Sequence, residues 1–182
     1  MSRKFAVVLS VVVLAVSSAL AGNNPKVGGQ EMYPTKNIIQ NAVNSSDHTT
    51  LVAAVKAAGL VDTLEGTGPF TVFAPTNEAF NKLPAGTVDT LLKPENKETL
   101  TKILTYHVVA GRLSASDLKK QIKAGGGTAQ LTTVEGGKLW ASLQGGNIML
   151  KDEKGGTAIV TIPNVFQSNG VIHVIDSVVQ PN

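Results

Sequence analysis

Apolar residues recur at helical spacing through the stretch that follows residue 36. Val55 follows Val52 by three positions and Leu51 by four, which places these residues on one face of a helix. Asp47 stands where this helix needs an N-terminal cap, and Gly59 stands where it should stop. The same reasoning predicts further helices that begin near Ile38, at Thr76 or Asn77, after Pro94 and at Ser114.

The last third of the chain changes to short β-prone segments. Pairs of glycines at positions 136/137, 145/146 and 155/156 separate them, which predicts an antiparallel meander of hairpins. Asn169-Gly170 is a further tight-turn signal, and the apolar segment from Val171 to Val179 should lie in the interior of a sheet. An earlier short strand is expected from Phe70 to Ala74, ended by Pro75. Together these patterns predict an α+β fold, helical in its N-terminal half and rich in hairpins in its C-terminal half.

Residues 1–21 have the three-part pattern of an export signal. Arg3 and Lys4 form a basic head, an apolar run extends from Phe5 to Val16, and Ala19 and Ala21 are the small residues that a signal peptidase requires. The alternative is a membrane anchor, but this run is shorter than the roughly 20 residues that cross a bilayer. We therefore expect cleavage after Ala21 and a mature protein in the periplasm or the extracellular space. No membrane span is expected in the mature form.

The mature chain is expected to begin with a flexible leader or loosely docked arm over residues 22–35. This stretch contains Asn23, Asn24, Pro25 and two adjacent glycines, and it shows no apolar periodicity. Residues 36–182 are expected to form one domain, which is long enough to bury a core of its own.

Composition excludes several classes of chemistry. The 182 residues include no cysteine, which excludes disulfides, thiolate zinc sites, iron–sulfur clusters and a cysteine nucleophile. The formal charge is +3, from 16 basic and 13 acidic residues, and removal of Arg3 and Lys4 with the signal leaves 14 against 13, or +1. With an aromatic fraction of only 4%, this balance argues against a nucleic-acid binder.

The three histidines do not have the spacing of a metal site, because no two of them stand four residues apart. His107 lies on the apolar stripe of its helix, and His173 lies within an apolar strand. Both are therefore expected to be core residues satisfied by hydrogen bonds. His48, next to the expected cap, is predicted to be exposed. No metal or other cofactor is expected.

No catalytic motif stands out either. The sequence contains no G-x-S-x-G nucleophile elbow and no glycine-rich phosphate loop. Asp176 and His173 suggest a dyad, but residues three apart on a strand point to opposite faces. A glycosidase-type pair of catalytic carboxylates is left open, because the two partners need not be close along the chain. The protein is predicted not to be an enzyme, and an envelope hydrolase is kept as an alternative.

Three segments, in order and at suitable separation, resemble the fasciclin-like domain family, close to its short, secreted bacterial members. They are Thr71–Phe80, Ile103–Val109 and Asn169–Asp176. The first and last match the two homology boxes of that family, and we single out as structural-motif residues Phe73, Pro75, Thr76, Phe80, Gly170, His173 and Asp176. The middle segment matches its tyrosine-histidine motif at Tyr106 and His107. Asn77 departs from the pattern, since the family often has Asp there.

The resemblance implies a compact β-sheet wedge flanked by helices. It also implies a role in adhesion or extracellular interaction, with a cell-surface component, a matrix component or another protein as the partner. Tyr106 and His107 are the candidate interaction surface, because that region is linked to integrin binding in animal members. The acidic integrin motifs of those members have no good match here, so that partner is not carried over. An alternative function is binding of an apolar ligand, a carotenoid or a lipid, in a cleft beside the Tyr106-His107 helix.

Overall fold

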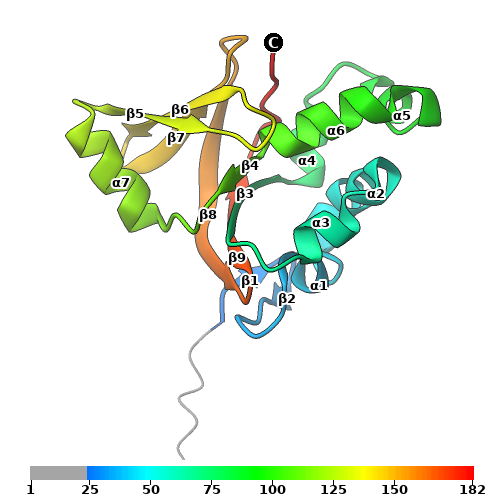
Figure 1. Ribbon diagram of the computed structural model, residues 1–182, viewed down its shortest axis with the longest axis horizontal. Coiled ribbons are helices and arrows are strands. Elements are labelled where there is room, and N and C mark those ends of the chain that lie inside the picture. The colour runs from blue at the N-terminus through cyan, green and yellow to red at the C-terminus, as the bar shows by residue number, and fades with distance from the viewer. Residues whose placement is uncertain (1–23) are drawn as a thin grey trace, which may run out of the picture.

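A strongly curved sheet of seven strands organises the protein (Figure 1). The computed structural model describes residues 24–182, so the predicted export signal lies outside the described residues. The strand order is β4-β3-β9-β8-β7-β6-β5. The strands are β3 (Phe70–Pro75), β4 (Val108–Ala110), β5 (Thr128–Thr132), β6 (Lys138–Gln144), β7 (Asn147–Lys151), β8 (Thr157–Gln167) and β9 (Gly170–Ile175).

Strands β5 to β9 form the antiparallel meander that the glycine pairs predict. The pairing of β9 with β3 is parallel and joins segments about a hundred residues apart. At the other end of the order, Val109 bridges Thr133, and the Val134 N–H donates to the Val108 carbonyl at 2.7 Å. The two ends of the sheet are thus connected, and the sheet curls toward a closed barrel.

The helices lie in two groups on either side of this sheet (Figure 1). One helix, α7 (Ala115–Ala124), packs alone against β5, β6 and β7. The others lie on the opposite side: α1 (Ile38–Ala42), α2 (Thr49–Ala58), α3 (Val61–Glu65), α4 (Asn77–Asn81), α5 (Thr87–Leu91) and α6 (Lys97–Tyr106), with single turns of 3₁₀ helix at η1 (Ser46–His48) and η2 (Pro94–Asn96). This arrangement confirms the predicted α+β class.

Local capping signals account for several of the helix boundaries. Thr76 caps α4 by accepting a hydrogen bond from the Ala79 N–H at 3.2 Å. Ser114 and Asp117 form the reciprocal capping box at the start of α7, and Gly59 ends α2 in the left-handed conformation. The prediction that Asp47 caps α2 is wrong. Asp47 lies inside η1, because a 3₁₀ turn precedes the helix and moves its start to Thr49.

Alternate residues of the central strands face two separate cores. Val72 and Ala74 of β3, like Ile172 and Val174 of β9, pack against the group of helices that includes α1, α2 and α6. We call this the helix-side core. Phe73 and Ile175 point the other way, into the interior of the curled sheet, where α7 covers them with Leu118 and Ile122. Each of these side chains is buried, and full burial of one large aliphatic side chain stabilises the fold by about 1.5–3 kcal/mol.

Of the two alternatives for the leader, the structure contradicts the flexible one over residues 24–35 and shows a docked arm. Residues 24–35 contain a small hairpin of β1 (Lys26–Val27) and β2 (Gln30–Glu31). Val27 is 3% exposed and Met32 is 2% exposed, and both belong to the helix-side core. The Ser46 hydroxyl also donates to the Gly28 carbonyl at 2.9 Å. Two apolar side chains at the right places dock this hairpin although the segment has no periodicity.

Candidate functional site

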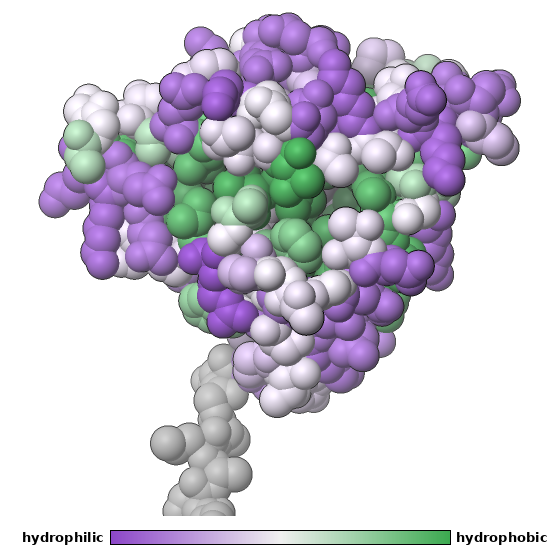
Figure 2. Space-filling view, viewed as in Figure 1, coloured by the Kyte–Doolittle hydropathy of each residue, from purple (hydrophilic) through white to green (hydrophobic). Residues whose placement is uncertain are grey.

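An apolar groove lies where the helix group meets β3. Figure 2 shows hydrophobic side chains gathered in a hollow in the middle of one face, surrounded by hydrophilic ones. The groove encloses about 60 Å³, and its lining is almost wholly apolar. Its lining includes Ile38, Ile39, Leu51, Val52, Val55, Leu60, Val61, Leu64, Phe70, Val72, Leu104 and Val134, together with Ser45, His48 and His107.

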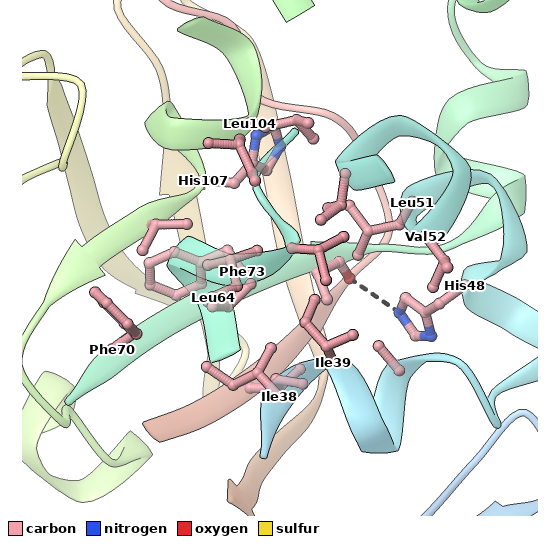
Figure 3. Close-up of a pocket in the computed structure, with 18 of the residues that line it drawn as sticks. Ile38, Ile39, His48, Leu51, Val52, Leu64, Phe70, Phe73, Leu104 and His107 are labelled. Carbon is pink, nitrogen blue, oxygen red and sulfur yellow. Dashed lines mark hydrogen bonds between the residues drawn. The ribbon is translucent and has the colours of Figure 1, made fainter. Parts of the chain in front are cut away.

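The groove forms because several short amphipathic helices converge on one strand. Figure 3 shows Ile38 and Ile39 on one side of it, Leu51 and Val52 of α2 on another, and Phe70 at the start of β3. Val134, at 47% exposure, is one lining side chain that faces solvent.

His48 lies in the wall of this groove, so the prediction that it is exposed is wrong. The residue is 3% exposed, its Nδ1 lies 2.9 Å from the Ser45 hydroxyl, and its Nε2 lies 3.4 Å from the Ala74 carbonyl (Figure 3). Burial lowers the pKa of His48 below its usual value. The sequence carried the signal, since His48 stands three residues before Leu51 on the apolar stripe of the next helix.

His107 and Tyr106 are both inside the protein, at 2% and 0% exposure. The expected interaction surface is therefore corrected: neither side chain is available to touch a partner directly. His107 lines the groove, with its Nδ1 2.8 Å from the Ile103 carbonyl and its Nε2 accepting a bond from the Val179 N–H at 3.2 Å. Burial lowers the pKa of His107 to about 4.

Tyr106 points away from the groove into the core of the curled sheet. Its hydroxyl donates to the Lys138 carbonyl at 2.5 Å and accepts from the Glu153 N–H at 3.2 Å. Burial raises the pKa of Tyr106 to about 12, so the hydroxyl stays protonated and keeps its donor role. Tyr106 and His107, the two residues of the motif, thus lie on opposite sides of the sheet.

The third histidine, His173, is a core residue as predicted. Its Nε2 lies 2.7 Å from the Leu113 carbonyl, and its Nδ1 accepts a bond from the Asn164 N–H at 3.2 Å. The ring stacks on Phe73, with 5.7 Å between the ring centroids. Burial lowers the pKa of His173 as well.

The other motif residues lie around the parallel strand pair. Pro75 ends β3 opposite Ile175, and Phe80 of α4 is buried in the helix-side core. Gly170 begins β9, and a Cβ there would overlap the Phe70 carbonyl. These positions shape the junction between β3 and β9 rather than a surface.

Asp176 and His173 do not form a dyad, as the strand geometry predicts. The Asp176 carboxylate accepts a hydrogen bond from the Ile159 N–H at 2.8 Å and lies 3.7 Å from the Lys82 ammonium. In residues 24–182 no group of three or more His, Asp or Glu side chains is placed to hold a metal ion. Over the same residues, no helix is long and apolar enough to cross a lipid bilayer.

Comparison with known proteins supplies a family. The family model described as Fasciclin domain matches residues 46–181. Protein sll1483 of Synechocystis is 48% identical over 144 residues, which is 79% of this chain and 73% of that protein. Cell surface glycolipoprotein MPB83 of Mycobacterium bovis is 35% identical over 170 residues, 88% of this chain and 68% of that protein. A solved domain pair from the insect cell adhesion molecule Fasciclin I superposes with a TM-score of 0.69 at 21% identity, over 78% of this chain and 50% of that one.

Proposed function

The chain belongs to the fasciclin domain family, and from this premise we propose that it is an exported, non-enzymatic binding module. Its partner is a cell-surface component, a matrix component or another protein. It works in the periplasm or the extracellular space. The name of the mycobacterial relative, a cell surface glycolipoprotein, supports that location.

The observation that carries the proposal is the apolar groove. Hydrophobic hollows rimmed by polar residues mark sites of interaction on protein surfaces. Val134 is exposed, and Val52 and Val61 are half-buried, so an apolar side chain of a partner can reach all three. His48 and His107 have their ring nitrogens engaged by neighbouring groups, which leaves the groove with an apolar rather than a catalytic surface.

A binding assay with a charge placed at the groove tests this proposal. The domain from residue 22 onward is titrated onto cell envelopes of its own source, and saturable binding is expected. Val134→Lys should weaken that binding at least tenfold, because a partner would have to desolvate the ammonium group. Binding that does not saturate, or that Val134→Lys leaves unchanged, would exclude the groove as the contact surface.

Leu143→Lys is the matched control. Leu143 is 43% exposed on β6 and does not line the groove, so the same charge is added at nearly the same exposure. Binding should stay within twofold of the parent protein. Both variants should keep the parent's melting temperature, since exposed substitutions usually change stability by less than about 0.5 kcal/mol.

A second candidate function is binding of an apolar small molecule, a carotenoid or a lipid. The groove favours it because its lining is almost wholly apolar and lies beside His107 at the end of α6. The enclosed 60 Å³ is smaller than the roughly 150 Å³ cavity that holds benzene, so such a chain would lie along the open part of the groove. Protein purified from its native source is tested for visible absorbance and for extractable lipid. A colourless, lipid-free preparation would contradict this candidate.

A further inference from the structure

A second concave surface lies over strands β5, β6 and β7 of the meander. It is an open pocket of about 560 Å³ lined by Thr128, Trp140, Lys151, Asp152, Glu153, Lys154 and Gly155. We call it the Trp140 pocket. Its volume falls in the range of about 300–1,000 Å³ that is typical of ligand sites. None of its residues lines the groove.

Trp140 is the single tryptophan of the chain, and it stands on the outer face of β6. Its neighbours Leu139 and Ala141 point into the core, whereas Trp140 is half-buried. In the sheet it lies directly between Gln130 of β5 and Lys151 of β7. Side chains opposite each other on neighbouring strands are about 5 Å apart, so an amide and an ammonium flank the indole.

The turn that forms the wall of the pocket is held rigidly. The Asp152 carboxylate accepts from the N–H groups of Gly156 and Gln180, at 2.6 and 2.9 Å. The Glu153 carboxylate accepts from the Lys138 N–H at 2.9 Å. The Tyr106 hydroxyl donates to the Lys138 carbonyl and accepts from the Glu153 N–H. A recognition surface built on such a fixed turn loses little entropy when a ligand binds.

The two lysines of the pocket form no ion pair with the described residues, so their ammonium groups can donate hydrogen bonds to a ligand. The ion pairs among residues 24–182 are Lys82 with Asp176 and Lys102 with Glu135, so neither Lys151 nor Lys154 takes part in one. Both are exposed at the pocket. Two ammonium groups and two carboxylates sum to a charge of zero, which gives an anionic ligand no net attraction.

We propose that the Trp140 pocket binds a neutral pyranose sugar of a polysaccharide. The indole offers a flat apolar surface for the C–H face of a sugar ring, and Lys151, Lys154 and Thr128 offer hydrogen bonds to its hydroxyls. A pocket in which an aromatic plane lies beside hydroxyl and charged groups fits a ligand that has one apolar face and a polar edge. This assignment rests on the proposed role as an exported binding module, but it uses a different surface.

Tryptophan fluorescence tests the proposal directly, because the chain has one tryptophan and it lies in the pocket. The domain from residue 22 onward is titrated with hexaoses of β-1,4-linked glucose, mannose, galactose and N-acetylglucosamine, and with hexagalacturonate as an anionic probe. At least one neutral hexaose should give a saturable change in emission. No change with any of the four, or a change with hexagalacturonate alone, overturns the proposal.

Variants then separate this site from the groove. Trp140→Ala and Lys154→Ala should each weaken binding of the active hexaose. Binding by Trp140→Ala is measured by calorimetry and should fall at least tenfold, equivalent to about 1.4 kcal/mol. Lys119→Ala, an exposed lysine of α7 outside the pocket, is the matched control and should bind like the parent. Val134→Lys should also leave sugar binding unchanged. Equal binding by Trp140→Ala and the parent would contradict the assignment, whatever the outcome of the envelope assay.

Discussion

At the scale of single residues, the buried histidines act as neutral connectors between backbone segments. His107 joins the Ile103 carbonyl to the Val179 N–H, and His173 joins the Leu113 carbonyl to the Asn164 N–H. An imidazole can accept a bond from a backbone N–H only while that nitrogen is unprotonated. The same hydrogen bonds that satisfy these rings therefore tie the stability of the fold to pH.

We predict that the protein loses stability as the pH falls from 6.5 to about 4. The pKa of His107 is 6.5 in the unfolded chain and about 4 in the folded one, so the unfolded chain binds the proton first. His107 alone should cost roughly 3 kcal/mol across this window, and His48 and His173 act in the same direction. Urea unfolding at pH 7.5 and pH 4.5 measures the loss. Equal free energies of unfolding at the two pH values would contradict the prediction.

Asn77 caps a helix other than its own. Its Oδ1 accepts from the Thr50 N–H at 3.0 Å, in the first turn of α2, and its Nδ2 donates to the Ser46 carbonyl at 2.8 Å. Asn77→Ala should lower the free energy of unfolding by about 1 kcal/mol, the usual cost of a lost cap. Asn77→Asp should cost less, because a carboxylate at a helix N-terminus gains about 0.3–1 kcal/mol while the bond to Ser46 is lost. Chemical denaturation of the three proteins gives the order, and an alanine variant as stable as the parent would contradict the capping role.

At the scale of elements, the parallel pair of β3 and β9 depends on a close approach of two backbones. Gly170 has no room for a side chain, since a Cβ would overlap the Phe70 carbonyl and contact Ile38. The distance between paired strands is set by their hydrogen bonds, so the strands cannot move apart without losing several of them.

Gly170→Ala should therefore destabilise the protein by about 1–3 kcal/mol, the range for overpacking. Gly146→Ala is the contrast, because Gly146 lies at an open hairpin turn with a φ of +86° and meets no atom nearby. It should show only the cost of the left-handed backbone, about 1–2 kcal/mol. The test is whether Gly170→Ala also disturbs the slow-exchanging amides of β3, which Gly146→Ala should leave intact. An unchanged β3 in both variants would count against the close-approach argument.

The β1–β2 hairpin is a second element whose role rests on a few contacts. Val27→Ala removes apolar atoms from the helix-side core and should cost about 1–3 kcal/mol, counting about 0.8 kcal/mol for each buried methylene and the cavity left behind. Val43→Ala, at 49% exposure on the residue after α1, should change the free energy of unfolding by less than about 0.5 kcal/mol. Equal effects of the two variants in urea unfolding would mean that the hairpin is not docked in solution.

At the scale of the whole molecule, the sheet separates two cores, and a different concave surface lies near each of them. The helix-side core borders the apolar groove, whereas the meander that encloses the other core carries the Trp140 pocket on its outer face. The tyrosine-histidine motif lies between them: His107 lines the groove, and Tyr106 supports the turn beside the pocket.

Hydrogen exchange should reveal the order of stability across the molecule. The amides of β3 and β9 should exchange slowest, because every residue of β9 and nearly every residue of β3 is buried. The amides of α5 should exchange fastest among the helices described, since none of its residues is buried. Exchange measured by mass spectrometry or NMR checks both statements, and strong protection of α5 would contradict the second.

Much of this fold is predictable from the chain because local spacing carries it. The period of Leu51, Val52 and Val55, the capping box at Ser114 and the turn at Asn169-Gly170 each depend only on residues close in sequence. The burial of His107 and His173 follows in the same way, from apolar neighbours on the same stripe or strand. The family resemblance rests on three such local segments.

The tertiary structure alone decided which apolar surfaces meet. Periodicity shows that a face is buried but not what buries it, so the parallel pairing of β3 with β9, the docking of Val27 and the remote cap at Asn77 were out of reach. The sequence also could not show which cavity the ring of His48 borders, or that the Tyr106 hydroxyl supports the turn beside the Trp140 pocket. The groove is assembled from segments far apart in the sequence, and such contacts depend on the packing of the whole chain rather than on any local pattern.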